Sequence, residues 1–62
     1  MIKNLEETKK EFVEIVEKFL ENTKNEDVKE DMLFLANMIA QKEKKYIGKS
    51  IKELYLSLKK EL

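Results

Sequence analysis

The sequence predicts a small all-α protein, and three observations support this expectation. Its 62 residues include no proline and only one glycine, so the residue types that most often interrupt helices are nearly absent. Apolar residues recur at spacings of three and four in three successive segments, as they do on one face of a helix. Polar residues suited to capping helices separate these segments. We therefore expect one helical domain over residues 1–62, with helices at about 3–22, 26–47 and 51–61.

The first predicted helix has one apolar and one charged face. At about 100° per residue, its large apolar side chains fall within an arc of roughly 160°. These side chains are Leu5, Phe12, Val13, Ile15, Val16, Phe19 and Leu20. Lys9 is the one charged residue inside this arc. We expect its stem to pack against the core while its ammonium group reaches solvent at a partly exposed edge.

The second predicted helix follows a polar break at residues 22–25. Thr23 or Asn25 can accept hydrogen bonds from the free backbone N–H groups of its first turn. Three lysines near residues 42–45 match the negative end of the helix dipole. Gly48 follows, and glycine readily adopts the positive φ that often ends a helix. These signals predict that the helix ends at residue 46 or 47.

Ser50 and Glu53 mark the start of the third predicted helix, because they have the spacing of a capping box. Its apolar stripe consists of Ile51, Leu54, Tyr55, Leu58 and Leu62. Three helices with short connections favour an up-down-up bundle, and a helical hairpin with a short third helix is the alternative.

A domain of this size is marginally stable, since it buries only about 60% of the surface that its unfolded chain exposes. The sequence contains no cysteine or histidine, which excludes disulfides and ordinary zinc sites as reinforcement. We therefore expect oligomerisation to complete the fold.

The second predicted helix is too apolar for two neighbouring helices to cover. Its apolar arc spans roughly 260°, because Leu33 and Phe34 project from its back on either side of Asn37. An exposed contiguous apolar patch usually marks a contact surface. We therefore predict an interface, with a second copy in a homodimer or with another protein, formed by Leu33, Phe34, Asn37, Met38, Gln41 and Leu56. Asn37 either fixes the register of that contact or is simply exposed to solvent.

The sequence indicates no catalytic, metal or cofactor chemistry. Nucleophilic catalysis needs an activated side chain with a positioned base, and the chain has neither histidine nor cysteine. Carboxylates such as Glu7, Glu11 and Glu14 alternate with lysines on a solvated face, where acid–base pairs are not tuned by burial. We expect a protein–protein interaction or regulatory module that is not an enzyme and acts through the apolar surface of the second helix.

The charge distribution supports an alternative hypothesis. Thirteen lysines balance thirteen acidic residues, yet residues 1–31 carry a net charge of −4 and residues 32–62 carry +4. Antiparallel helices with complementary surfaces would explain this asymmetry, and so would contact with an acidic partner. The basic 42–52 segment would bind nucleic-acid phosphates through Lys42, Lys44, Lys45, Lys49 and Lys52. Because the chain has no arginine, the residue best suited to reading guanine, nucleic-acid binding remains the alternative.

The sequence also bears on location. The most apolar stretch, residues 32–40, is far shorter than the roughly 20 residues that a membrane span needs. Residues 1–7 lack the apolar run of a signal peptide. We therefore expect a cytoplasmic protein without a membrane partner.

Overall fold

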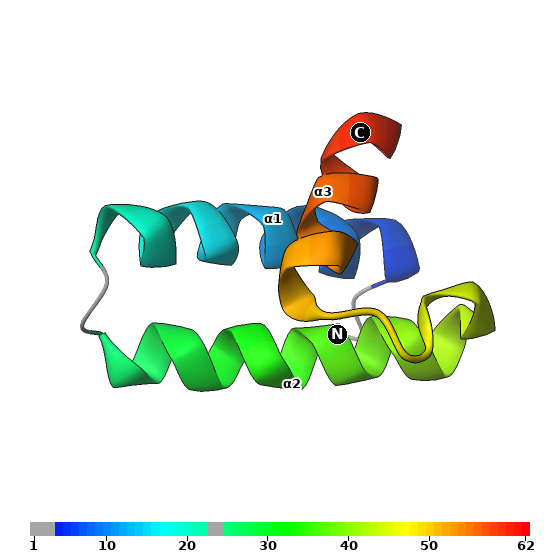
Figure 1. The fold of residues 1–62 in the computed structure, drawn as a ribbon, viewed down its shortest axis with the longest axis horizontal. Helices are drawn as coiled ribbons and strands as arrows, with labels where there is room; N and C mark the ends of the chain where they lie inside the picture. Colours follow the sequence, from blue (N-terminus) through cyan, green and yellow to red (C-terminus); the bar gives the residue numbers. More distant parts are fainter. Residues whose placement is uncertain (1–3, 23–24) are drawn as a thin grey trace.

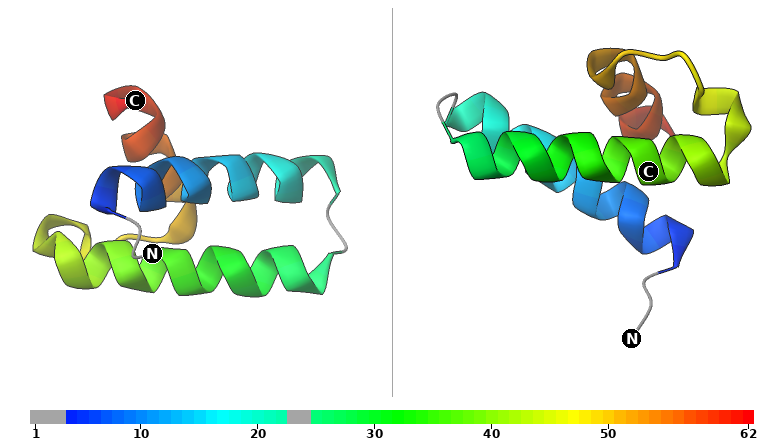
Figure 2. Two further views of the ribbon diagram at one scale, coloured as in Figure 1. Left: turned by 180° about the vertical axis from the view of Figure 1, so that it is seen from behind. Right: turned by 90° about the horizontal axis from the view of Figure 1, so that it is seen from below.

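The structure, a computed structural model, describes residues 4–22 and 25–62. These residues form α1 (Leu5–Glu21), α2 (Glu26–Lys42), the short 3₁₀ helix η1 (Lys44–Tyr46) and α3 (Ile51–Glu61). α1 and α2 lie side by side as an antiparallel hairpin, and α3 crosses this hairpin steeply (Figures 1 and 2). The all-α prediction is confirmed, and this small bundle is closer to the hairpin with a short third helix. Its completion by oligomerisation stays a prediction.

The helices begin at residues that can cap them. Asn4 and Asn25 cap α1 and α2, because their side-chain oxygens accept hydrogen bonds from first-turn N–H groups. At α3 both bonds of the predicted capping box form. Ser50 Oγ accepts from the Glu53 N–H at 3.2 Å, and Glu53 Oε1 accepts from the Ser50 N–H at 3.1 Å. The latter bond lowers the pKa of the Glu53 carboxyl. Thr23, the other predicted cap of α2, lies outside the described residues.

The core contains one fully buried side chain from each α-helix: Phe12, Ile39 and Leu58. The remaining buried apolar residues surround these three and are Val16, Met32, Leu35, Tyr46, Leu54 and Tyr55. α1 and α2 have 17 residues each, whereas α3 has 11. α3 is therefore too short to cover a whole face of the hairpin.

α2 ends five residues before the predicted position. Glu43 has an extended backbone (φ −116°, ψ 100°), and its N–H donates the last helical hydrogen bond to the Ile39 carbonyl. Since α1 and α2 are equally long and antiparallel, a helix continuing to residue 47 would extend past the first described turn of α1. The break instead allows Tyr46 to fold back into the core. The prediction of one continuous helix to residue 47 is therefore wrong: α2 ends at Lys42, and residues 44–46 form the separate 3₁₀ helix η1.

The 47–50 connection leads the chain back along α2 before α3 begins (Figure 1). Gly48 has a φ of +87°, which residues with a Cβ rarely adopt. The positive φ expected at Gly48 is present, but this residue follows η1 and does not cap α2. The Lys49 N–H closes the turn by donating to the Tyr46 carbonyl at 3.2 Å.

Lys9 is buried, contrary to the expectation of a partly exposed lysine. It is only 6% exposed, and its ammonium lies 2.5 Å from the Glu43 carboxylate and 3.6 Å from that of Glu6. A buried ammonium without a counter-charge would carry a large desolvation cost. The hydrogen bond with Glu43 raises the pKa of Lys9. The pair thus links α1 to the residue that ends α2.

A second polar contact links η1 to the end of α3. The Tyr46 hydroxyl donates to Glu61 at 2.7 Å, and the Lys45 ammonium lies 3.3 Å from the same carboxylate. The hydrogen bond from Tyr46 is the main reason why the pKa of Glu61 is lowered, and Lys45 adds to it. The Lys45 ammonium also lies 5.0 Å from the Tyr46 ring centroid. Tyr46 therefore combines a buried ring with a paired hydroxyl, the ordinary arrangement for tyrosine in a core.

Glu43→Gln is expected to lower the free energy of unfolding by about 2–3 kcal/mol, because the Lys9 ammonium stays buried without its main counter-charge. Lys9→Met removes the buried charge itself. The remaining Glu43 side chain is 24% exposed and lies 3.7 Å from Lys45, so we expect a loss of about 1 kcal/mol or less. Urea denaturation followed by circular dichroism measures both values. Equal losses in the two variants would contradict this asymmetry.

Acid is expected to destabilise the protein partly through Glu61. Because its pKa is lower in the folded than in the unfolded state, its stabilising effect is present above the ordinary carboxyl pKa and disappears as the pH falls through the folded value. Tyr46→Phe removes the main cause and should flatten the fall in Tm below about pH 4.5. Thermal melts across this pH range measure the effect, and parallel curves for both proteins would contradict it.

Candidate functional site

Large apolar side chains are exposed at several positions of the described chain. They are between 45% and 64% exposed and comprise Leu20, Leu33, Phe34, Ile47, Leu56 and Leu62. Single exposed apolar residues are ordinary on protein surfaces, whereas a contiguous patch usually marks a contact site. Whether these side chains gather around a surface groove therefore decides whether they mark a contact site, and two grooves are relevant.

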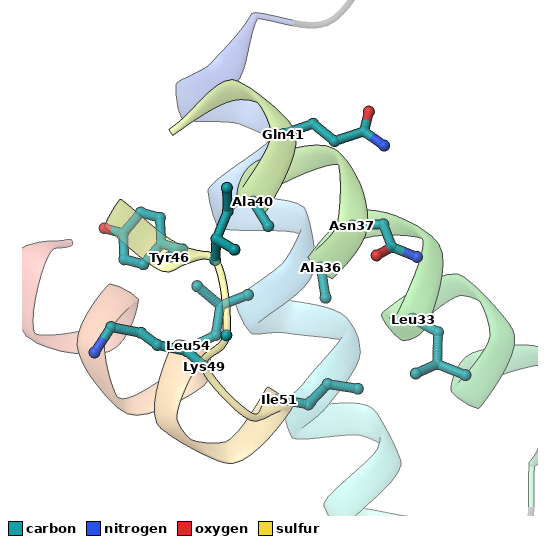
Figure 3. A pocket seen from close by; sticks show the side chains of 11 residues that line it. Leu33, Ala36, Asn37, Ala40, Gln41, Tyr46, Lys49, Ile51 and Leu54 are labelled. Carbon is teal, nitrogen blue, oxygen red and sulfur yellow. The ribbon is translucent and has the colours of Figure 1, made fainter. Parts of the chain in front are cut away.

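The first groove, here the α2 groove, lies between α2 and the 47–50 connection and has a volume of about 380 Å³ (Figure 3). Leu33, Asn37 and Gln41 line it from α2, while Ile47 and Ile51 line it from the opposite side. Two alanines of α2 lie between these walls. Their small side chains leave the groove open.

The second groove, here the α3 groove, lies where α1, α2 and α3 meet and has a volume of about 330 Å³. Phe19 and Leu20 line it from α1, and Tyr55 and Leu56 line it from α3. Ile51 at the start of α3 lines both grooves. The grooves are therefore adjacent parts of one apolar surface on either side of the first turn of α3.

The structure places four of the six predicted interface residues in these grooves. Leu33, Asn37 and Gln41 belong to the α2 groove, and Leu56 belongs to the α3 groove. Asn37 is exposed at the groove, so its role in fixing the register of a contact stays a prediction.

Phe34 and Met38 lie apart from both grooves. Met38 is half-buried and packs against the core, whereas Phe34 is 64% exposed. Adjacent residues point about 100° apart on a helix, so Phe34 projects from a different side of α2 than Leu33 does. Whether all six residues contribute to one contact surface stays a prediction.

Sequence reasoning missed Ile47 and Leu20 as exposed residues, whereas Ile51, predicted on the core stripe, is half-buried and packs against the core. Ile47 is 64% exposed because the break at Glu43 turns Tyr46 inward and leaves its neighbour outside. Leu20 is exposed because α3 crosses the hairpin and leaves the end of α1 uncovered (Figure 1). The apolar stripe of each helix was visible in the sequence, but the crossing of α3 was not.

The basic 42–52 segment is not uniformly available to a polyanion. Lys45 already pairs with Glu43 at 3.7 Å and with Glu61 at 3.3 Å. The other lysines predicted to contact phosphates are exposed and form no ion pair within the described ranges: Lys42, Lys44, Lys49 and Lys52. An exposed apolar side chain, Ile47, lies among them.

Within residues 4–22 and 25–62, no group of three or more acidic, histidine or cysteine residues is arranged to hold a metal ion. No helix of this part of the chain is long and apolar enough to cross a membrane. Comparisons with protein families, with curated proteins and with solved structures found no match to this chain. The two grooves and the exposed apolar side chains are therefore the observations that bear on function.

Replacing the exposed apolar residues should cost little stability. Leu33→Gln and Phe34→Gln are each expected to change the free energy of unfolding by less than about 0.5 kcal/mol, because both residues are exposed, Leu33 by 45% and Phe34 by 64%. Ile39→Val removes a single methylene from a fully buried position and should cost about 1 kcal/mol. Urea titrations of the three variants provide the comparison. A larger loss at Phe34 than at Ile39 would show that Phe34 supports the fold.

Proposed function

We propose that this protein is a small, non-enzymatic interaction module that binds another protein chain through the apolar surface formed by the α2 and α3 grooves. The observation that supports this proposal most is the exposure of Leu33, Ile47 and Leu56, between 45% and 64%, around the shared residue Ile51. A small domain has few large apolar side chains to stabilise its core. Burying one such side chain is worth about 1.5–3 kcal/mol, so leaving several outside favours a surface used for binding.

The character of the grooves favours a protein partner over a nucleic acid. Nucleic-acid interfaces are polar and strongly positive. Ile47 and Ile51 instead line the α2 groove beside the basic segment, and internal carboxylates already pair with Lys45. Apolar walls with a charged rim are typical of protein interfaces.

In-cell photo-cross-linking tests the proposal. A photoreactive amino acid at Ile47, in the α2 groove, is expected to capture a discrete protein. The same amino acid at Glu14, which is exposed on the charged face of α1, serves as the matched control and is expected to capture none. The captured protein, purified separately, should bind the wild type, and Ile47→Gln should weaken this binding by roughly tenfold or more.

Three outcomes would contradict the proposal: no capture at Ile47, the same captured proteins at both positions, or unchanged affinity of the Ile47→Gln variant. Release of the protein from heparin at moderate salt, together with cross-links to nucleic acid from Ile47, would instead support the alternative function.

A further inference from the structure

We propose that the partner of the α3 groove is a second copy of this chain, bound head to tail, with Phe34 of one copy inserted into the α3 groove of the next. This inference rests on the proposed function, because it names the occupant of part of the same surface. It draws on two faces of the protein, one acidic around an exposed aromatic ring and the other net basic around an apolar groove.

The first face surrounds Phe34 and is acidic. Asp27, Glu30 and Asp31 precede Phe34 by seven, four and three residues, so all three lie beside its ring on one side of α2. The three acidic side chains are exposed, and none forms an ion pair with another described residue. This face therefore presents one largely exposed aromatic ring next to three carboxylates that have no ion-pair partner within residues 4–22 and 25–62.

The second face surrounds Leu56 and is basic. Lys52, Lys59 and Lys60 lie four residues before and three and four residues after Leu56, on the same outer side of α3. Lys52 lines the α3 groove, and Lys60 is exposed nearby. The Lys59 ammonium lies 3.5 Å from the Glu17 carboxylate of α1, so this lysine is already paired within its own chain. The face therefore presents an apolar groove lined by Lys52, with Lys60 exposed nearby and one carboxylate, Glu53, three residues before Leu56 on the same side.

These two faces fit each other better than either fits itself. The apolar ring of Phe34 matches a groove with apolar walls, and the three carboxylates face the ammonium groups of Lys52 and Lys60, because Lys59 already pairs with Glu17. Pairing Phe34 faces with each other would bring like charges together, and so would pairing two α3 grooves. Because the chain has a formal net charge of zero, two copies also approach without overall repulsion.

The positions of the two faces make the contact head to tail. Met32 lines the α3 groove from α2, and Phe34 follows it by two residues, or about 200° around the helix. The acidic face and the basic groove therefore lie on opposite sides of α2. Two copies cannot exchange both contacts reciprocally, so the association extends as a chain or closes as a ring.

Mixing two variants tests this arrangement. Phe34→Gln removes the inserted ring, and Leu56→Gln alters the groove; both sites are exposed, and glutamine is a good helix former. In sedimentation equilibrium the wild-type mass should rise above 7.4 kDa with concentration, while each variant alone stays near that value. An equimolar mixture should form dimers only, because each pair retains one intact acidic face and one intact groove. Leu62→Gln, which changes a leucine of the same exposure at the end of α3, should behave like the wild type.

Each alternative result has a defined meaning. Wild type that stays monomeric at about 1 mM, roughly the weak end of specific affinity, overturns the inference. Failure of the mixture to associate when both single variants are monomeric also overturns it. Raising the salt to about 0.5 M should weaken wild-type association by roughly tenfold, and no salt effect would overturn the charge pairing.

The same experiments separate this inference from the proposed function. A monomeric wild type together with specific capture of a different protein at Ile47 overturns the second copy as partner and leaves the proposed function standing. The absence of both association and capture overturns both.

Discussion

The ion pair between Lys9 and Glu43 connects the apolar face of α1 to the end of α2, where the chain turns towards α3. An ammonium group within the apolar face of α1 needs a nearby carboxylate, and Glu43 supplies it at the residue where α2 ends. The contact fixes the end of the hairpin, from which the chain turns through η1 and buries Tyr46. Where α3 begins, and which parts of α1 and α2 it covers, follow from this turn.

Burying Tyr46 has a direct consequence for the surface. The ring of Tyr46 turns inward at η1, which leaves Ile47 outside and returns the chain along α2. α3 then crosses the hairpin instead of following it, so the first turn of α3, with Ile51, becomes the boundary between two grooves. A third helix packed along the full hairpin would fill both. The same geometry that completes the core therefore creates the candidate binding surface.

The sequence predicted local structure better than it predicted the relation between helices. Caps at Asn25 and Ser50 and the core stripes follow from spacing and side-chain chemistry, so they were visible in the sequence. The end of α2 was not, because the residues up to 47 continue a helical pattern and the partner of Lys9 lies more than thirty residues away. Lys9 was the available signal, since a charge within an apolar arc implies a counter-charge. The excess of apolar residues on α2 was visible in the sequence. Which of them α3 covers, and which stay exposed as Leu33 and Phe34 do, depends on where α3 crosses the hairpin.

Packing within one chain also leaves much of the charge asymmetry of the sequence uncompensated. The Lys9–Glu43 pair joins a lysine of the acidic half to a glutamate of the basic half. It therefore compensates neither the excess negative charge of residues 1–31 nor the excess positive charge of residues 32–62. The Lys59–Glu17 pair, in contrast, joins a lysine of the basic half to a glutamate of the acidic half. The acids beside Phe34 and the lysines Lys52 and Lys60 beside Leu56 form no ion pair within the described residues. Water and salt ions screen these exposed charges, and direct pairing of the two sides needs contact with another molecule. The proposed head-to-tail arrangement would supply that contact without a second kind of chain.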